Sequence, residues 1–111
     1  KDPTAKKRYG VIADYMHLGG PNDDEKVALL IKYLRGMNDE LNIPHGINKY
    51  GADGMPAETG FVPEDIFLAR VDEIADNAIA DACTGSNPRI PNHDEMVALL
   101  KACYYDTEVD F

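Results

Sequence analysis

The side chains best suited to chemistry are grouped in residues 83–89, which read CTGSNPR. They bring a thiol, two hydroxyls, a carboxamide and a guanidinium within one short stretch, and these are groups that donate and accept hydrogen bonds and pair with charges. From the residues alone, we expect Cys83 to be a small buried apolar group at a helix end. We expect Asn87 to satisfy backbone amides of the loop and Arg89 to pair with a carboxylate.

The same stretch is expected to be a stiff loop between two helices. Thr84 is β-branched, Gly85 is entropically costly in a helix and Ser86 competes for backbone donors, so the preceding helix should end near Cys83. Prolines at 88 and 91 then push the residue before each of them into an extended conformation. These elements would hold the side chains of the loop in fixed positions.

Metal binding has weak support in the sequence. His17, His45 and His93 lack the spacing of H-x-x-x-H or H-E-x-x-H motifs, and we expect each to be a surface histidine. Cys83 and Cys103 form no C-x-x-C motif, and we expect reduced thiols. A metalloenzyme built from the histidines and the abundant carboxylates remains an alternative, which an iron or zinc titration would test.

Other cofactor and catalytic motifs are also missing from the sequence. There is no G-x-G-x-x-G after a strand and no nucleophile elbow around a serine. A calcium loop with Gly54 as its turn glycine would place Lys49 and Gly51 at ligand positions. We therefore expect that these residues bind no cofactor by themselves.

Composition limits the class of protein. The 111 residues allow one domain at most, and the formal net charge of -9 disfavours nucleic acid and anionic membranes as partners. No run of about 18 apolar residues and no charged-then-apolar leader occurs. We expect a soluble, cytoplasmic protein, and the start at Lys1 rather than Met suggests a piece of a longer chain.

Hydrophobic periodicity predicts an all-α fold of four or five helices. The expected helices are 3–18, 23–41, 63–83 and 92–105, and no segment alternates with period two. Asn22 with Glu25, and Asn92 with Glu95, have the spacing of capping boxes. Residues 51–62 are expected to be a surface loop, with Gly46 before it available for a left-handed conformation, and 106–111 a tail.

The apolar stripes indicate which faces should be buried. The second helix has so wide an apolar face that we expect it to pack against more than one neighbour. The expected stripes are Ala5, Tyr9, Ile12, Ala13 and Met16; Val27, Leu30, Ile31, Leu34, Met37 and Leu41; Phe67, Val71, Ile74, Ala75, Ala78 and Ala82; and Met96, Leu99, Leu100 and Cys103.

Residues 83–89 resemble the C-T-G-x-N-P-R signature of iron-dependent (group III) alcohol dehydrogenases, in the variant of bifunctional aldehyde-alcohol dehydrogenases, and we call them the signature loop. Further matches follow the family's order: 7–14 to R-R-Y-x-x-I-A-D, with Lys7 for the first Arg; 41–44 to L-x-I-P; 67–72 to F-L-A-x-V-D; and 104–105 to its terminal aromatics. The connection at 51–62 is longer than is usual in the family.

The resemblance implies that residues 1–111 are the C-terminal helical domain, or part of it, of the dehydroquinate synthase-like fold. The family's nucleotide-binding domain, and the Asp and three His that hold iron, would precede Lys1. The string Pro44-His45-Gly46 is similar to one that carries an iron ligand, but it follows the downstream L-x-I-P turn, so no metal role is assigned to His45. In the family, the cysteine of the signature lies beside the substrate channel, which makes Cys83 a candidate channel-wall residue and not a nucleophile.

The remaining signature-loop residues implied by the resemblance are Thr84, Gly85, Asn87, Pro88 and Arg89, with no catalytic residue and no metal ligand among them. The parent enzyme would use iron and NAD to reduce acetaldehyde to ethanol, with the remainder of the dehydrogenase and further copies as partners. The segment alone should be inactive. The alternative is a free-standing acidic helical module for protein interaction, which would be monomeric and melt cooperatively.

Overall fold

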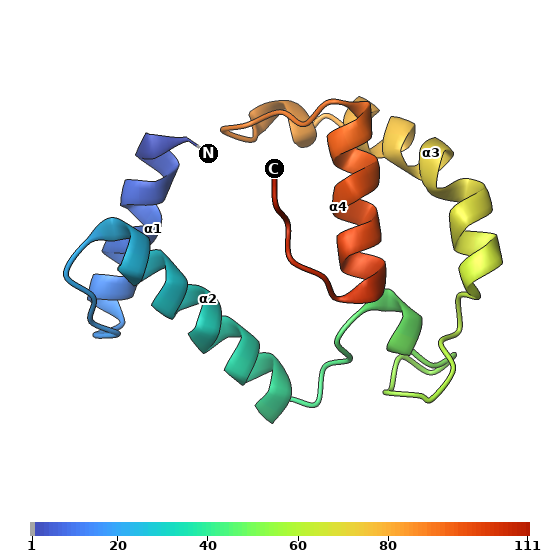
Figure 1. Cartoon of the computed structure of the whole chain (residues 1–111), viewed down its shortest axis with the longest axis horizontal. Helices are drawn as coiled ribbons and strands as arrows, with labels where there is room; N and C mark the ends of the chain where they lie inside the picture. Colours follow the sequence, from blue (N-terminus) through green and yellow to red (C-terminus); the bar gives the residue numbers. More distant parts are fainter. Residues whose placement is uncertain (1) are drawn as a thin grey trace. The chain divides into compact units, whose positions relative to one another are not determined.

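The chain is all-α, as predicted. The computed structural model describes residues 2–111, in which four α-helices occur and the only strand-like pairing is a bridge between Tyr50 and Pro56. The helices are α1 Pro3–Tyr15, α2 Asp23–Glu40, α3 Glu64–Ala80 and α4 His93–Tyr105, with 3₁₀ helices η1 Ile47–Lys49 and η2 Thr84–Ser86 (Figure 1). None of the helices in this described range is long and apolar enough to cross a membrane.

The helices form two compact units, of which the first ends at Asn42 and the second runs from Ile43 to Phe111. In the first unit α1 packs against α2 through small residues, because Gly10 and Ala13 are its buried positions. A Cβ atom at Gly10 would lie 2.9 Å from Oδ1 of Asp23, so glycine permits this close approach.

Most of the apolar stripe expected on α1 and α2 is exposed. Ala13 is fully buried and Leu30 nearly so, but Tyr9 is 54% exposed and Ile12 is 44% exposed. Leu41, just past the end of α2, is 64% exposed. The first unit therefore presents apolar faces that two helices cannot cover by themselves.

The second unit has its core where α3 meets α4. The rings of Phe67 and Tyr104 are stacked, with centroids 4.2 Å apart, and Val71 is buried beside them. The hydroxyl of Tyr104 donates a hydrogen bond to the carbonyl of Val62 at 2.9 Å. The partly buried residues packed against this core are Ile47, Val62, Val97 and Leu100.

The buried face of α3 was predicted better than that of α4. Three of the six expected α3 positions, Phe67, Val71 and Ala75, are buried. On α4 the buried residues are Met96, Ala102 and Tyr104, whereas Leu99 and Cys103, which we expected inside, are exposed. The stack on Phe67 accounts for the difference, because it turns the Tyr104 side of α4 inward.

Helix α1 ends at Tyr15, three residues before the expected Leu18. The N–H of Leu18 bonds to the carbonyl of Ala13 and that of His17 to the carbonyl of Asp14, both at 3.0 Å, and His17 is left-handed with φ 57°. This is a Schellman motif, which closes the helix before Gly19 and Gly20 are reached.

The turn after α2 differs from its prediction in one respect. Gly46 has a positive φ of 143°, as expected, but Asn42 is left-handed as well, with φ 54°. Asparagine tolerates this conformation, and Asn42, which directly follows the C-cap residue Leu41, turns the chain away from the helix. Residues 51–62 form an irregular loop, as predicted, in which the N–H of Gly51 bonds to the carbonyl of Met55 at 2.7 Å.

Candidate functional site

The connection that contains the signature loop begins earlier than expected, because α3 ends at Ala80 and not near Cys83. Asp81 leaves the helical conformation, with ψ 133°, and its carboxylate accepts the N–H of Cys83 at 2.7 Å. The hydroxyl of Thr84 donates to the carbonyl of Ala78 at 2.6 Å. Side chains thus take over backbone groups that a further helical turn would have used.

Polar side chains in the middle of the loop bond to its own backbone. The hydroxyl of Ser86 donates to the carbonyl of Cys83 at 2.7 Å, beside the short helix η2. The side-chain amide of Asn87 donates to the carbonyl of Arg89 at 2.8 Å. Asn87 therefore does bond to the loop backbone, but it donates to a carbonyl, whereas we expected it to accept from loop amides.

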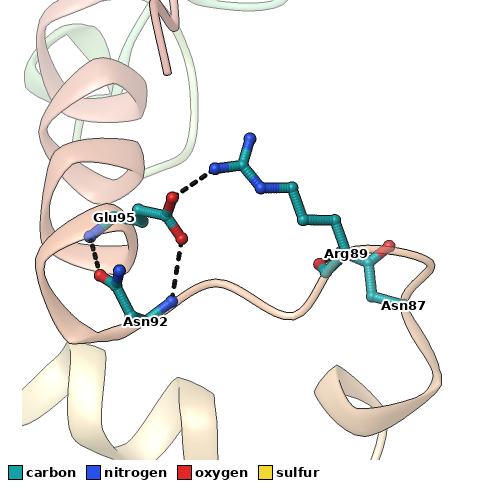
Figure 2. A network of polar contacts seen from close by, with 4 residues as sticks. All are labelled: Asn87, Arg89, Asn92 and Glu95. Carbon is teal, nitrogen blue, oxygen red and sulfur yellow. Dashed lines mark hydrogen bonds and ion pairs between the residues drawn. The ribbon is translucent and has the colours of Figure 1, made fainter. Parts of the chain in front are cut away.

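At the other end, the loop is joined to the first turn of α4. Figure 2 shows the guanidinium of Arg89 paired with Oε1 of Glu95, while Oε2 of Glu95 accepts the N–H of Asn92 at 3.0 Å. The N–H of Glu95 in turn donates to Oδ1 of Asn92 at 2.9 Å. The sequence predicted both the capping box and a carboxylate partner for Arg89. The carboxylate of Glu95 fills both roles.

The charge of Glu95 is stabilised by this arrangement. The N–H of Asn92 is the main cause that lowers the pKa of the Glu95 carboxyl below its ordinary value, and the Arg89 guanidinium adds to it. Burial acts in the opposite direction and is outweighed. Glu95 is therefore held as the anion that the guanidinium requires.

The tail after α4 also reaches Arg89. Asp106 turns the chain with φ 55° at the end of α4, and the tail runs back beside that helix (Figure 1). The ring of Phe111 lies 5.2 Å from the guanidinium carbon of Arg89, which is a cation–π contact. The tail has no regular secondary structure. Its contact with Arg89 was not foreseen from the sequence.

Cys83 is a free, exposed thiol, and so is Cys103. The expectation of a small buried apolar group at Cys83 is therefore wrong. The physical reason is the early end of α3, since the Asp81 turn takes Cys83 off the buried face of the helix. Its side chain is available to a partner or a substrate.

His45 and His93 lie beside carboxylates without forming a metal site. Nδ1 of His45 is 3.2 Å from Oδ2 of Asp106, and Nε2 of His93 is 3.4 Å from Oδ1 of Asp76. Nowhere in residues 2–111 do three histidine, cysteine, aspartate or glutamate side chains gather in a way that could hold a metal ion. The donor set for an iron site thus does not fit the described part of this chain.

Two contacts of the loop were missed by sequence reasoning. Asp81 was treated as part of the helix, although an Asp two residues before Cys83 has the spacing of an Asx turn and could have been recognised. The contact of Phe111 with Arg89 joins residues far apart in the sequence, and no local pattern marks it.

Comparison with known proteins gives one consistent result. The family model described as Fe-containing alcohol dehydrogenase family, C-terminal, matches residues 1–104. The chain is 40% identical over 108 residues to an NADPH-dependent butanol dehydrogenase of Clostridium saccharobutylicum, a match that covers 97% of this chain and 25% of the relative.

Two further relatives are bifunctional or aldehyde-alcohol enzymes. Identity is 38% over 104 residues to an aldehyde-alcohol dehydrogenase of Clostridium acetobutylicum, covering 94% of this chain and 11% of the relative. It is 37% over 105 residues to the bifunctional aldehyde-alcohol dehydrogenase AdhE of Escherichia coli, covering 93% and 11%. The chain spans a quarter or less of these relatives, and it belongs to the iron-containing alcohol dehydrogenase family as a C-terminal part.

Proposed function

We propose that residues 1–111 are the C-terminal helical part of an iron- and NAD-dependent alcohol dehydrogenase that reduces acetaldehyde to ethanol. The names of the relatives, which include aldehyde-alcohol and butanol dehydrogenases, support an aldehyde and alcohol pair as substrate and product. The observation that carries the proposal is the family match across residues 1–104, which includes the complete signature loop.

In this proposal, the chain shapes the active site without performing the chemistry. Residues 2–111 provide no group of metal ligands, so iron would be held by other parts of the dehydrogenase, and the family resemblance implies the same for the nicotinamide. The exposed thiol of Cys83, on a loop bonded at both ends, would form part of the wall of the substrate channel. Two exposed free thiols are also typical of the reducing cytoplasm, where we place the enzyme.

The exposed apolar residues of the first unit support docking to the remainder of the dehydrogenase and, beyond it, a homo-oligomer. Tyr15 is 85% exposed, and Ile31 on α2 is about half exposed. A hollow on α2 is lined by Leu29, Lys32, Tyr33, Gly36, Met37 and Glu40. Exposed apolar surface of this extent commonly marks a protein interface.

The test compares the full-length protein that contains this segment with residues 1–111 alone. We expect acetaldehyde-dependent oxidation of NADH by the full-length protein and none by the segment. A preference for NADPH would show that the cofactor is NADP and not NAD. Activity or tight iron binding by the segment alone would overturn the proposal.

Thermal unfolding of the segment at several concentrations separates the alternative function. Exposed apolar faces should make the melting temperature depend on protein concentration through self-association. A monomer that melts cooperatively at the same temperature throughout would favour the independent interaction module.

A further inference from the structure

The carboxylate of Glu95 uses both oxygens to join two structural elements. Oε2 belongs to the capping box of α4, through the N–H of Asn92, and Oε1 holds the guanidinium of Arg89 (Figure 2). The side chain of Glu95 is 23% exposed and that of Arg89 is 40% exposed. The pair is thus shielded from solvent more than a free surface ion pair, which salt and water weaken.

The other side-chain bonds of the signature loop are made within the loop or to α3, and not directly to α4. Ser86 and Asn87 bond to carbonyls of the loop itself, and Thr84 ties the loop to α3. Pro88 and Pro91 lack an N–H, so the backbone on either side of Arg89 has no hydrogen-bond donor at these two positions. Among the described contacts of residues 83–89, the Arg89–Glu95 pair is the one that joins the loop side chains directly to α4.

We propose that Glu95 is a positioning residue, which holds Arg89 and thereby fixes where the signature loop presents Cys83. The inference rests on the function proposed above, in which Cys83 narrows the substrate channel. Phe111 lies over the same guanidinium and keeps it near the carboxylate. Without the charge on Glu95 the loop would loosen, and the channel would discriminate less against long alcohols.

The test uses Glu95→Gln in the full-length protein. Glutamine keeps the shape of the side chain and an oxygen for the capping box, so it removes mainly the charge that binds Arg89. The matched control is Glu73→Gln, which makes the same change in the exposed Arg70–Glu73 pair on α3, where Nε of Arg70 is 2.7 Å from the carboxylate. That pair has no bond to the loop among the contacts described above.

Amide hydrogen exchange and substrate specificity are measured on both variants. The specificity measurement also includes Cys83→Trp. Amide hydrogen exchange across residues 84–89 should be about three- to fivefold faster in Glu95→Gln than in the control. The ratio of kcat/KM for 1-hexanol to that for ethanol should rise about threefold or more in Glu95→Gln, fall in Cys83→Trp, and stay unchanged in Glu73→Gln.

The outcomes separate the two proposals. Unchanged exchange in Glu95→Gln would overturn the positioning role, and so would faster exchange with an unchanged ratio, since the loop would then move without effect on specificity. An unchanged ratio in Cys83→Trp would instead overturn the channel-wall function of the loop, whatever the exchange result for Glu95→Gln.

Discussion

The hydroxyl of Tyr105 donates a hydrogen bond to the carboxylate of Glu64 at 2.5 Å, joining the last turn of α4 to the first turn of α3. This bond is the main cause that raises the pKa of Tyr105 from 10 to about 12, and burial adds to it. Ionisation would break the bond and set a phenolate against a carboxylate. The contact between α3 and α4 is therefore sensitive to alkaline pH.

Its pH dependence has a definite sign. Because the folded chain binds this proton more tightly than the unfolded chain, the contribution of Tyr105 is complete below pH 10 and is lost as pH rises toward about 12. We expect Tyr105→Phe to flatten the fall in melting temperature across this range. The control is Tyr15→Phe, at a position 85% exposed, which should leave the slope as in the wild type. Equal slopes in all three proteins would contradict the prediction.

The core of the second unit should depend on Phe67 far more than on other phenylalanines. Phe67 is 4% exposed and stacked on Tyr104, whereas Phe61 is 67% exposed. Phe67→Ala should lower the free energy of unfolding by about 3–5 kcal/mol through lost burial and a cavity. Phe61→Ala should change it by less than about 0.5 kcal/mol. Denaturant titration followed by circular dichroism measures both, and similar losses would show that the core lies elsewhere.

The cap of α4 should make a measurable contribution to stability. Asn92→Ala removes the oxygen that accepts the N–H of Glu95 at 2.9 Å, and should cost about 1 kcal/mol of unfolding free energy. Asn92→Ser keeps a capping oxygen and should recover most of this loss. The same denaturant titration applies, and a serine variant as unstable as the alanine variant would argue against a capping role.

Helix starts were predictable because their signals are local. Asn22 and Asn92 each accept the N–H three residues on, as their spacing indicated. The ends of α1 and α3 were missed, because residues outside the apolar period decide them, whereas α4 ends at Tyr105 as predicted. A left-handed His17 closes α1, and the carboxylate of Asp81 turns the chain after α3. Neither residue type identifies a helix end on its own.

Buried faces and loop contacts were predictable to different degrees. The sequence indicated that Arg89 would find a carboxylate, since a guanidinium next to a helix start rich in acids has partners close by, but the shared use of Glu95 needed the folded geometry. The exposure of Cys83 follows from the Asp81 turn, which we had not recognised, and the contact with Phe111 depends on tertiary packing. Periodicity alone could not supply either of them.

The acid side of the stability profile should report on Glu95. Its carboxyl pKa is lowered below 4.5, mainly by the N–H of Asn92, so its contribution is complete above the ordinary pKa and is lost as pH falls through the folded value. Melting temperatures between neutral pH and strong acid should fall less steeply in Glu95→Gln than in Glu73→Gln. Parallel curves for the two variants would contradict the assigned pKa direction.

The exposed thiols allow the channel-wall function to be tested by chemical modification. Cys83 and Cys103 are both free and exposed, so a maleimide should label two thiols in native residues 1–111. In the full-length protein, if Cys83 lines the substrate channel as proposed, its labelling should reduce turnover of 1-hexanol more than that of ethanol, because the adduct would narrow the channel. Cys83→Ala should be resistant to this effect and Cys103→Ala should remain sensitive. Loss of both activities in parallel, or resistance conferred by Cys103→Ala instead, would remove Cys83 from the channel wall.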